Sequence, residues 1–139
     1  MQNERWNGMQ GWGLTVLRVV VGIVFLVHGS QKLFVYGFGG VAGFLGQLGI
    51  PLPAVSAVAL TAVEFLGGLA LLAGLFTRWA AAALAVSMLV AVLAAHLRAG
   101  FFLPNGYEFA LSLLGASIAL ALAGPGAAAV DSVLANRKA

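Results

Sequence analysis

Four ionisable side chains lie in segments of this chain that are otherwise almost entirely apolar: Arg18, His28, Lys32 and Glu64. A charged side chain at the centre of a helix in a bilayer costs roughly 2.5–3.5 kcal/mol on insertion scales. Such residues therefore face protein or water and have partners. Imidazoles and carboxylates transfer protons, while guanidinium and ammonium groups stabilise oxyanions. We expect any function within a membrane to depend on these residues, with Glu64 and His28 as the candidate catalytic groups.

The composition is that of a membrane protein. Of the 139 residues, 62% are hydrophobic and 8% are charged, and the mean hydropathy is +1.04, whereas soluble domains have about 25% charged residues. The net charge of +3 does not indicate nucleic-acid binding, because Lys and Arg are scattered with no basic run beyond Arg137-Lys138. The absence of cysteine excludes disulfides and Cys-ligated metal centres within the chain.

Apolar runs of about 20 residues predict four membrane-spanning helices within a single domain, residues 1–139. The spans cover residues 13–34, 54–76, 79–97 and 107–123, and residues 124–139 form a cytoplasmic tail. We therefore expect an all-α integral membrane four-helix bundle. Between the first two spans, residues 41–48 predict a short interfacial or re-entrant helix. Thr77 and Arg78 predict a tight turn that makes the second and third spans antiparallel neighbours.

The distribution of basic residues predicts the orientation in the membrane. Four spans place both termini on one side. That side holds Arg5, Arg78, Arg137 and Lys138, with Arg18 near it, and the other side holds Lys32 and Arg98. The positive-inside rule then predicts that both termini are cytoplasmic, an N-in, C-in topology.

The charges of the first span lie on one flank of its helix. At 100° per residue, Lys32 lies about 40° and His28 about 80° from Arg18. Gly22 and Gly29 belong to the same stripe. Because glycine lets a neighbouring backbone approach closely, we expect this flank to face the bundle.

Depth along the helices predicts two polar layers. Glu64 lies about 15 Å into its helix, near the bilayer midplane. The first layer is expected to be a buried group of Arg18, His28 and Glu64. The second is an outer group of Lys32 with Glu108. The candidate ligand-binding residues are therefore Arg18, His28, Lys32, Glu64 and Glu108.

Structural roles explain several of these residues equally well. Arg18 could extend its head group to the inner lipid headgroups, and a pair of Glu64 with Arg18 could simply fix the helix register. Glu108 suits the N-terminal end of a helix dipole. A metal site of His28, Glu64 and Glu108 lacks local ligand spacing, and no haem motif supports a haem between His28 and His96. We expect no metal and no cofactor held within the chain, although a quinone would fit an apolar slot beside such groups.

Short motifs follow one another along residues 12–131. In order, they are Arg18, His28-Gly29-x-x-Lys32, Leu48-Gly49-Ile50-Pro51, Glu64-x-x-Gly67-Gly68, Gly74-Leu75-x-Thr77-Arg78, Gly106-Tyr107-Glu108 and Gly124-Pro125-Gly126. Their order and spacing resemble the DoxX family, small four-helix proteins of the bacterial cytoplasmic membrane. Members of that family often carry a Ser and then an Asp after the Gly-Pro-Gly. Here the Asp position is Asp131, but the Ser position is Ala129, so the end of the fourth helix is less well defined.

The resemblance implies a link to redox chemistry. The family is named after a subunit of an archaeal thiosulfate:quinone oxidoreductase, and some bacterial members are linked to membrane complexes that handle oxidative or thiol stress. Most members have no assigned reaction. Because this chain lacks cysteine, any thiol chemistry would belong to a partner.

Three functions are compatible with the sequence, which leaves open whether the chain is itself an enzyme. The first, which we predict, is a quinone-linked redox or oxidative-stress membrane subunit, in which His28 and Glu64 relay protons and Arg18 or Lys32 stabilises an oxyanion. The second is a non-catalytic scaffold or assembly subunit of a membrane complex. The third is a small proton-coupled carrier with Glu64 titrating at the midplane. The expected partners are the lipid bilayer and either a second copy of the chain or another redox or membrane subunit.

Overall fold

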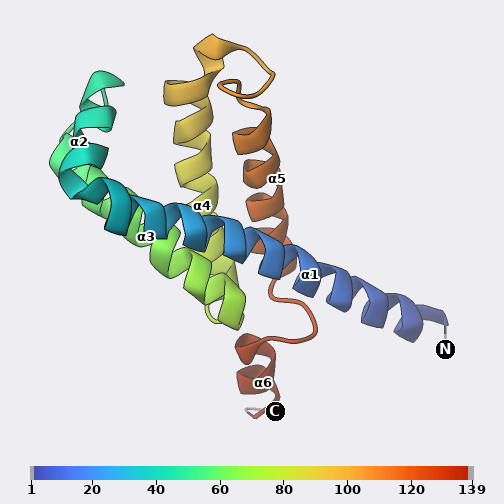
Figure 1. The fold of residues 1–139 in the computed structure, drawn as a ribbon. Helices are drawn as coiled ribbons and strands as arrows, with labels where there is room; N and C mark the ends of the chain where they lie inside the picture. Colours follow the sequence, from blue (N-terminus) through green and yellow to red (C-terminus); the bar gives the residue numbers. More distant parts are fainter. Residues whose placement is uncertain (1, 138–139) are drawn as a thin grey trace.

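The computed structural model describes residues 2–137, with side chains from residue 7 onward, and this part of the chain is helical apart from its turns and loops. The four long helices are α1 (Gln2–Ser30), α3 (Pro53–Ala73), α4 (Thr77–Val90) and α5 (Glu108–Ala123). Figure 1 shows α4 and α5 side by side, with α1 crossing in front of them along α3. The shorter helices are α2 (Gly37–Gln47), which packs on α3, and α6 (Val130–Asn136). The all-α fold predicted from the sequence is confirmed.

The first helix does not end where the first predicted span ends. Its helical backbone continues through a π-helical segment, η1 (Gln31–Tyr36), into α2. The chain changes direction at Gly37, whose φ of +66° is easily adopted by a residue without a Cβ. The short helix predicted at residues 41–48 is present as α2, and it packs Val41 and Leu45 around Ala57 of α3. The third span also ends irregularly, in a π-helical segment, η2 (Ala91–His96), and a single 3₁₀ turn, η3 (Leu97–Ala99).

The turn between α3 and α4 differs from the prediction. It lies at residues 74–76 rather than at Thr77-Arg78, which already belong to α4. The carboxylate of Asp131 accepts hydrogen bonds from the backbone N–H groups of Phe76 (2.8 Å) and Thr77 (2.9 Å). These N–H groups have no partner within the helix, so an acidic side chain from elsewhere fixes its start.

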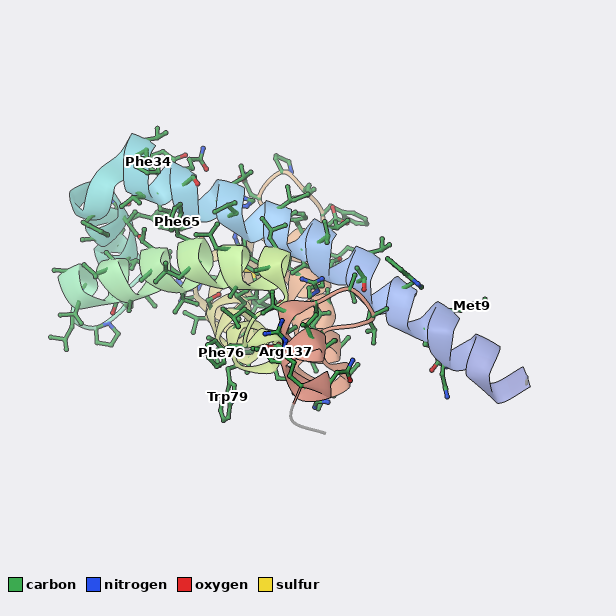
Figure 2. The ribbon with its side chains drawn as sticks, turned by 90° about the horizontal axis from the view of Figure 1, so that it is seen from below. Met9, Phe34, Phe65, Phe76, Trp79 and Arg137 are labelled. Atoms are coloured by element: carbon green, nitrogen blue, oxygen red, sulfur yellow. The ribbon has the colours of Figure 1, made fainter. Side chains whose placement is uncertain are left out.

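Helices α1 and α3 pack closely through glycine. The sequence predicted that the glycine flank of the first span faces the bundle, and the structure shows that α3 is its partner. A Cβ on Gly29 would lie 2.4 Å from the backbone nitrogen of Phe65, and a Cβ on Gly68 would lie 2.5 Å from that of Leu26. No side chain fits at either position. Gly22 makes a third contact of this kind. Figure 2 shows the result, with α1 and α3 running side by side.

In the described part of the chain, three helical stretches are long and apolar enough to cross a membrane: Asn7–Gln47, Pro53–Ala73 and Thr77–Ala99. The predicted fourth span, α5, is apolar but has 16 residues. A helix of that length reaches about 24 Å, compared with a hydrocarbon core of about 30 Å. Its crossing of the membrane therefore stays a prediction.

The segments near the two chain ends meet at one end of the bundle. The backbone N–H of Ala127 donates to the carbonyl of Gly11 at 3.0 Å. This contact agrees with an even number of crossings. The N-in, C-in orientation stays a prediction.

Candidate functional site

A cavity of about 450 Å³ lies among α1, α2, α3, α4 and α5, in the half of the bundle away from α6. Its walls are mostly apolar, with Phe25, Leu60, Val63, Met88 and Leu113 among them. Four ionisable side chains reach this cavity: His28, Lys32, Glu64 and His96. A mostly apolar pocket with a few convergent polar groups is the usual form of a small-molecule site.

The centre of the polar wall is an ion pair between Lys32 and Glu64. The ammonium Nζ lies 2.6 Å from the carboxylate Oε2. The Glu64 side chain is 4% exposed and that of Lys32 is 21% exposed, so the pair is largely shielded. Gly29 makes this contact possible, because it brings the α1 backbone against Phe65, next to Glu64, one helical turn before Lys32.

His28 lines this pocket, and its ring is oriented by a backbone carbonyl. Its Nδ1 lies 2.9 Å from the carbonyl of Val24, one turn earlier in α1. A carbonyl only accepts hydrogen bonds, so Nδ1 carries the proton and, in the neutral ring, Nε2 is the acceptor. Among residues 2–137, Nε2 has no hydrogen-bond partner. The ring packs against Phe109 of α5, with centroids 6.1 Å apart.

His96 is held in the same way on the other side of the cavity. Its Nδ1 lies 2.9 Å from the carbonyl of Asn105, so this ring too is oriented by a backbone acceptor. The structure places it in the cavity wall together with His28.

Both π-helical segments contribute to the cavity wall. Lys32 lies in η1, and His96 lies in η2 with three of its alanines, Ala91, Ala94 and Ala95. Single π-helical turns inside α-helices occur frequently at functional sites, because the widened turn redirects side chains. Sequence reasoning missed these segments, which have no characteristic apolar period.

The predicted buried group of Arg18, His28 and Glu64 is wrong in one member. The α1 and α3 helices are antiparallel, with Gly22 against Leu72 and Gly29 against Phe65. This register places Lys32 at the level of Glu64. It places Arg18 at the C-terminal end of α3, where its side chain cannot reach the carboxylate of Glu64.

Arg18 instead binds backbone carbonyls. Its guanidinium donates to the carbonyls of Leu71, Leu72, Pro125 and Ala128. The residue is 1% exposed, so the alternative in which it extends to the lipid headgroups is also wrong. Cations stabilise helix C-termini, where the last carbonyls have no partner within the helix. Arg18 therefore joins the end of α3 to the loop after α5.

The predicted outer pair of Lys32 with Glu108 is also wrong. Lys32 is bound to Glu64, and Glu108 does not line the cavity. Its Oε1 accepts a hydrogen bond of 2.7 Å from the backbone N–H of Leu103 in the preceding loop. Glu108 thus stabilises the loop at the start of α5, which fits the structural explanation drawn from its position.

A metal site finds no support in the geometry. Across residues 2–137, no group of three or more His, Asp or Glu side chains is arranged to hold an ion. One further polar atom is buried near the ion pair. The hydroxyl of Thr61, one turn before Glu64, has no hydrogen-bond partner in the described part of the chain.

The fold and the cavity define a helical membrane protein with a shielded ion pair and two histidines in a mostly apolar pocket. The family model for DoxX matches residues 13–97. The chain belongs to the DoxX family.

Several curated relatives cover most of this chain. The chain is 37% identical to "Putative oxidoreductase CatD" of Bacillus subtilis, over 86% of this chain and 84% of the relative. It is 30% identical to "Inner membrane protein YphA" of Escherichia coli, over 85% and 87%, and 31% identical to "Inner membrane protein YqjF" of the same species, over 91% and 94%. These names, together with the apolar helices, indicate the bacterial inner membrane. No solved structure shows a significant match.

Proposed function

We propose that this protein is a quinone-binding membrane subunit linked to redox or oxidative-stress chemistry. The observation that carries the proposal is the polar wall of the cavity, where the Lys32–Glu64 pair lies with His28 beside apolar side chains. A quinone head group is itself a flat apolar ring with two carbonyl oxygens. It needs an apolar slot with a few donors and acceptors, and a volume of about 450 Å³ is within the roughly 300–1,000 Å³ typical of small-molecule sites.

The chain's own residues supply the groups that such a ligand requires. The Lys32 ammonium donates hydrogen bonds and stabilises negative charge on an oxygen. The unpartnered Nε2 of His28 accepts a proton from a hydroxyl group, which is the task of a general base. Glu64 holds Lys32 in place and is itself a proton acceptor, so these three residues place donors and acceptors of protons at the wall of one cavity.

Electron transfer would involve a partner. The chain has no cysteine, so thiol oxidation belongs to another subunit. The name of the Bacillus subtilis relative, "Putative oxidoreductase CatD", supports a redox setting. A second copy of the chain or a redox subunit remains the expected partner.

The test is the identification of bound small molecules. Wild type, Glu64→Gln and Glu108→Gln would be purified in mild detergent and analysed by absorption spectroscopy and mass spectrometry of extracts. We expect near-stoichiometric quinone in the wild type and in Glu108→Gln, whose acid lies outside the cavity, and loss of quinone in Glu64→Gln. Circular dichroism would verify that all three remain folded.

Two alternatives would replace this proposal under defined results. Absence of quinone from wild type, with no binding of added quinone, would leave a scaffold or assembly subunit or a proton-coupled carrier. Proton uptake into proteoliposomes that depends on Glu64 would then favour the carrier. Capture of a membrane partner that survives the Glu64→Gln change would favour the scaffold.

A further inference from the structure

Part of the cavity wall is also part of the outer surface. Val86 and Val90 of α4 line the cavity, yet they are 63% and 44% exposed. Phe44 of α2, on the other side, is 53% exposed. Side chains that line a closed cavity would be shielded, so the cavity is open between α2 and α4.

The two helices beside this opening are held by α3 and not by each other. Both α2 and α4 pack on α3, and they make few contacts between themselves. Figure 1 shows α2 standing apart from α4, with α3 and α1 passing below the space between them. Among the described residues, α3 therefore supports both sides of the opening, and α2 and α4 make little contact across it.

The opening lies at the depth of the hydrocarbon. Val86 is near the middle of the apolar stretch Thr77–Ala99, and Glu64 is near the middle of Pro53–Ala73. The side chains at the opening are apolar, and the ion pair lies on η1 and α3, deeper in the bundle. A molecule entering here would come from the lipid with its polar end first.

We propose that this opening holds the isoprenoid tail of a long-tailed membrane quinone while the head group lies against Lys32, His28 and Glu64. The inference rests on the proposed quinone function and adds the ligand class and the route. A full-length isoprenoid tail is much larger than the cavity, so it must leave through an opening. The side between α2 and α4 keeps the tail in hydrocarbon, where its apolar surface is not exposed to water.

The test separates binding of the head from binding of the tail. Wild type, Val86→Trp and Val16→Trp would be reconstituted in lipid nanodiscs. Val16 is the matched control, because it is a lipid-facing valine, 62% exposed, that does not line the cavity. A radiolabelled tail-less dimethoxy-methyl-benzoquinone would report the head-group site directly. A long-tailed ubiquinone, incorporated at increasing mole fractions, would compete with it.

In Val86→Trp, we expect the affinity for long-tailed ubiquinone to fall at least about tenfold, because the indole occupies the space of the tail. The affinity of that variant for the tail-less quinone should stay within about twofold of wild type, because the head-group site is untouched. Val16→Trp should resemble wild type with both ligands. Should Val86→Trp fail to fold, Val90→Trp at the same opening would be judged by the same criteria.

The failures of the two proposals can be told apart. Wild type that binds neither quinone would overturn the proposed function and this inference with it. Tail-less binding with an unchanged affinity of Val86→Trp for the long-tailed quinone would overturn the route while the head-group site stands. An equal loss for both ligands would place the indole in the head-group site and would also overturn the route.

Discussion

The bundle has one polar cluster in each half, and the two clusters use their polar groups differently. We call them the closed end, formed by Arg18, Asp131 and the Gly124–Gly126 loop, and the cavity end, formed by His28, Lys32, Glu64 and His96. At the closed end, the guanidinium donates to four backbone carbonyls and the carboxylate accepts from two backbone N–H groups. At the cavity end, both imidazoles have a free Nε2 within the described residues.

This difference separates charges that are used up in holding the backbone from charges that leave polar atoms free for a ligand. In a bilayer, helix ends that are buried in protein have no water to bind their free carbonyl and N–H groups. A saturated cluster such as the closed end satisfies those groups and fixes the helices. The cavity end leaves acceptors beside an apolar space, as a ligand site requires. Residue type alone does not distinguish the two, because both clusters contain a cation and an acid.

The largest effect on stability is expected from Arg18→Leu. The change removes the guanidinium donor from four backbone carbonyls at a buried position, and of these Leu71 keeps the N–H of Gly74 as a donor. The free energy of unfolding should therefore fall by about 3–5 kcal/mol. Denaturation by SDS in mixed micelles would measure it. Arg18→Lys should lose less, because an ammonium keeps the charge but makes fewer bonds. A loss below about 1 kcal/mol in Arg18→Leu would show that the closed end does not stabilise the bundle.

Gly29→Ala should be the next most damaging change, and it affects the cavity end. Its Cβ would meet the Phe65 backbone at 2.4 Å, so α1 and α3 must separate, at a cost of about 2–3 kcal/mol. The separation should also break the Lys32–Glu64 pair and abolish quinone binding. The control is Gly13→Ala on the same helix, where nothing lies within 4 Å and the bundle should be unaffected. Equal behaviour of the two variants would refute the role of this contact.

A double-mutant cycle on Lys32 and Glu64 tests whether their pair is more than structural. Lys32→Met and Glu64→Gln should each cost about 1–2 kcal/mol, a moderate value because Lys32 keeps some exposure. The double variant should recover at least half of that loss, because no charge is left unpaired. Quinone binding should be absent in all three variants. Recovery of both stability and binding in the double variant would make the pair a structural element only.

The smallest effect is expected from Glu108→Ala. The change removes one acceptor from the backbone N–H of Leu103, so stability should fall by about 1 kcal/mol. The affinity for the tail-less quinone should not change, because Glu108 does not line the cavity. A loss of affinity for the tail-less quinone in the nanodisc assay would show that Glu108 belongs to the ligand site, as the sequence suggested.

The helical period made part of this arrangement predictable. The spacing of Arg18, Gly22, Gly29 and Lys32 placed all four on one flank, and the structure turns that flank toward α3. The partner of each charge was not predictable. It depends on how far α1 slides along α3, and that register follows from backbone contacts such as Gly29 with Phe65. The sequence predicted that Arg18 reaches the depth of Glu64. The actual register places Lys32 there, so Lys32 and not Arg18 is the partner of Glu64.

Two other features lack any local signal. A π-helical turn leaves the apolar pattern nearly unchanged, so the placement of Lys32 and His96 on such turns could not be anticipated. Asp131 was visible as part of a family pattern, but its partner is the N–H of Phe76, 55 residues earlier in the chain. Sequence spacing gives no account of contacts over such a distance.

The bond between Asp131 and the start of α4 has a consequence for the order of synthesis. Chains emerge from the ribosome N-terminus first, so the turn at residues 74–76 is made long before the acid that fixes it. The same holds for Arg18, which meets Pro125 and Ala128 only when α5 and the loop after it have been made. Until then, the guanidinium of Arg18 and the first N–H groups of α4 lack these partners. Residues that follow α5 in the chain therefore complete the packing around Arg18 of α1 and around the start of α4.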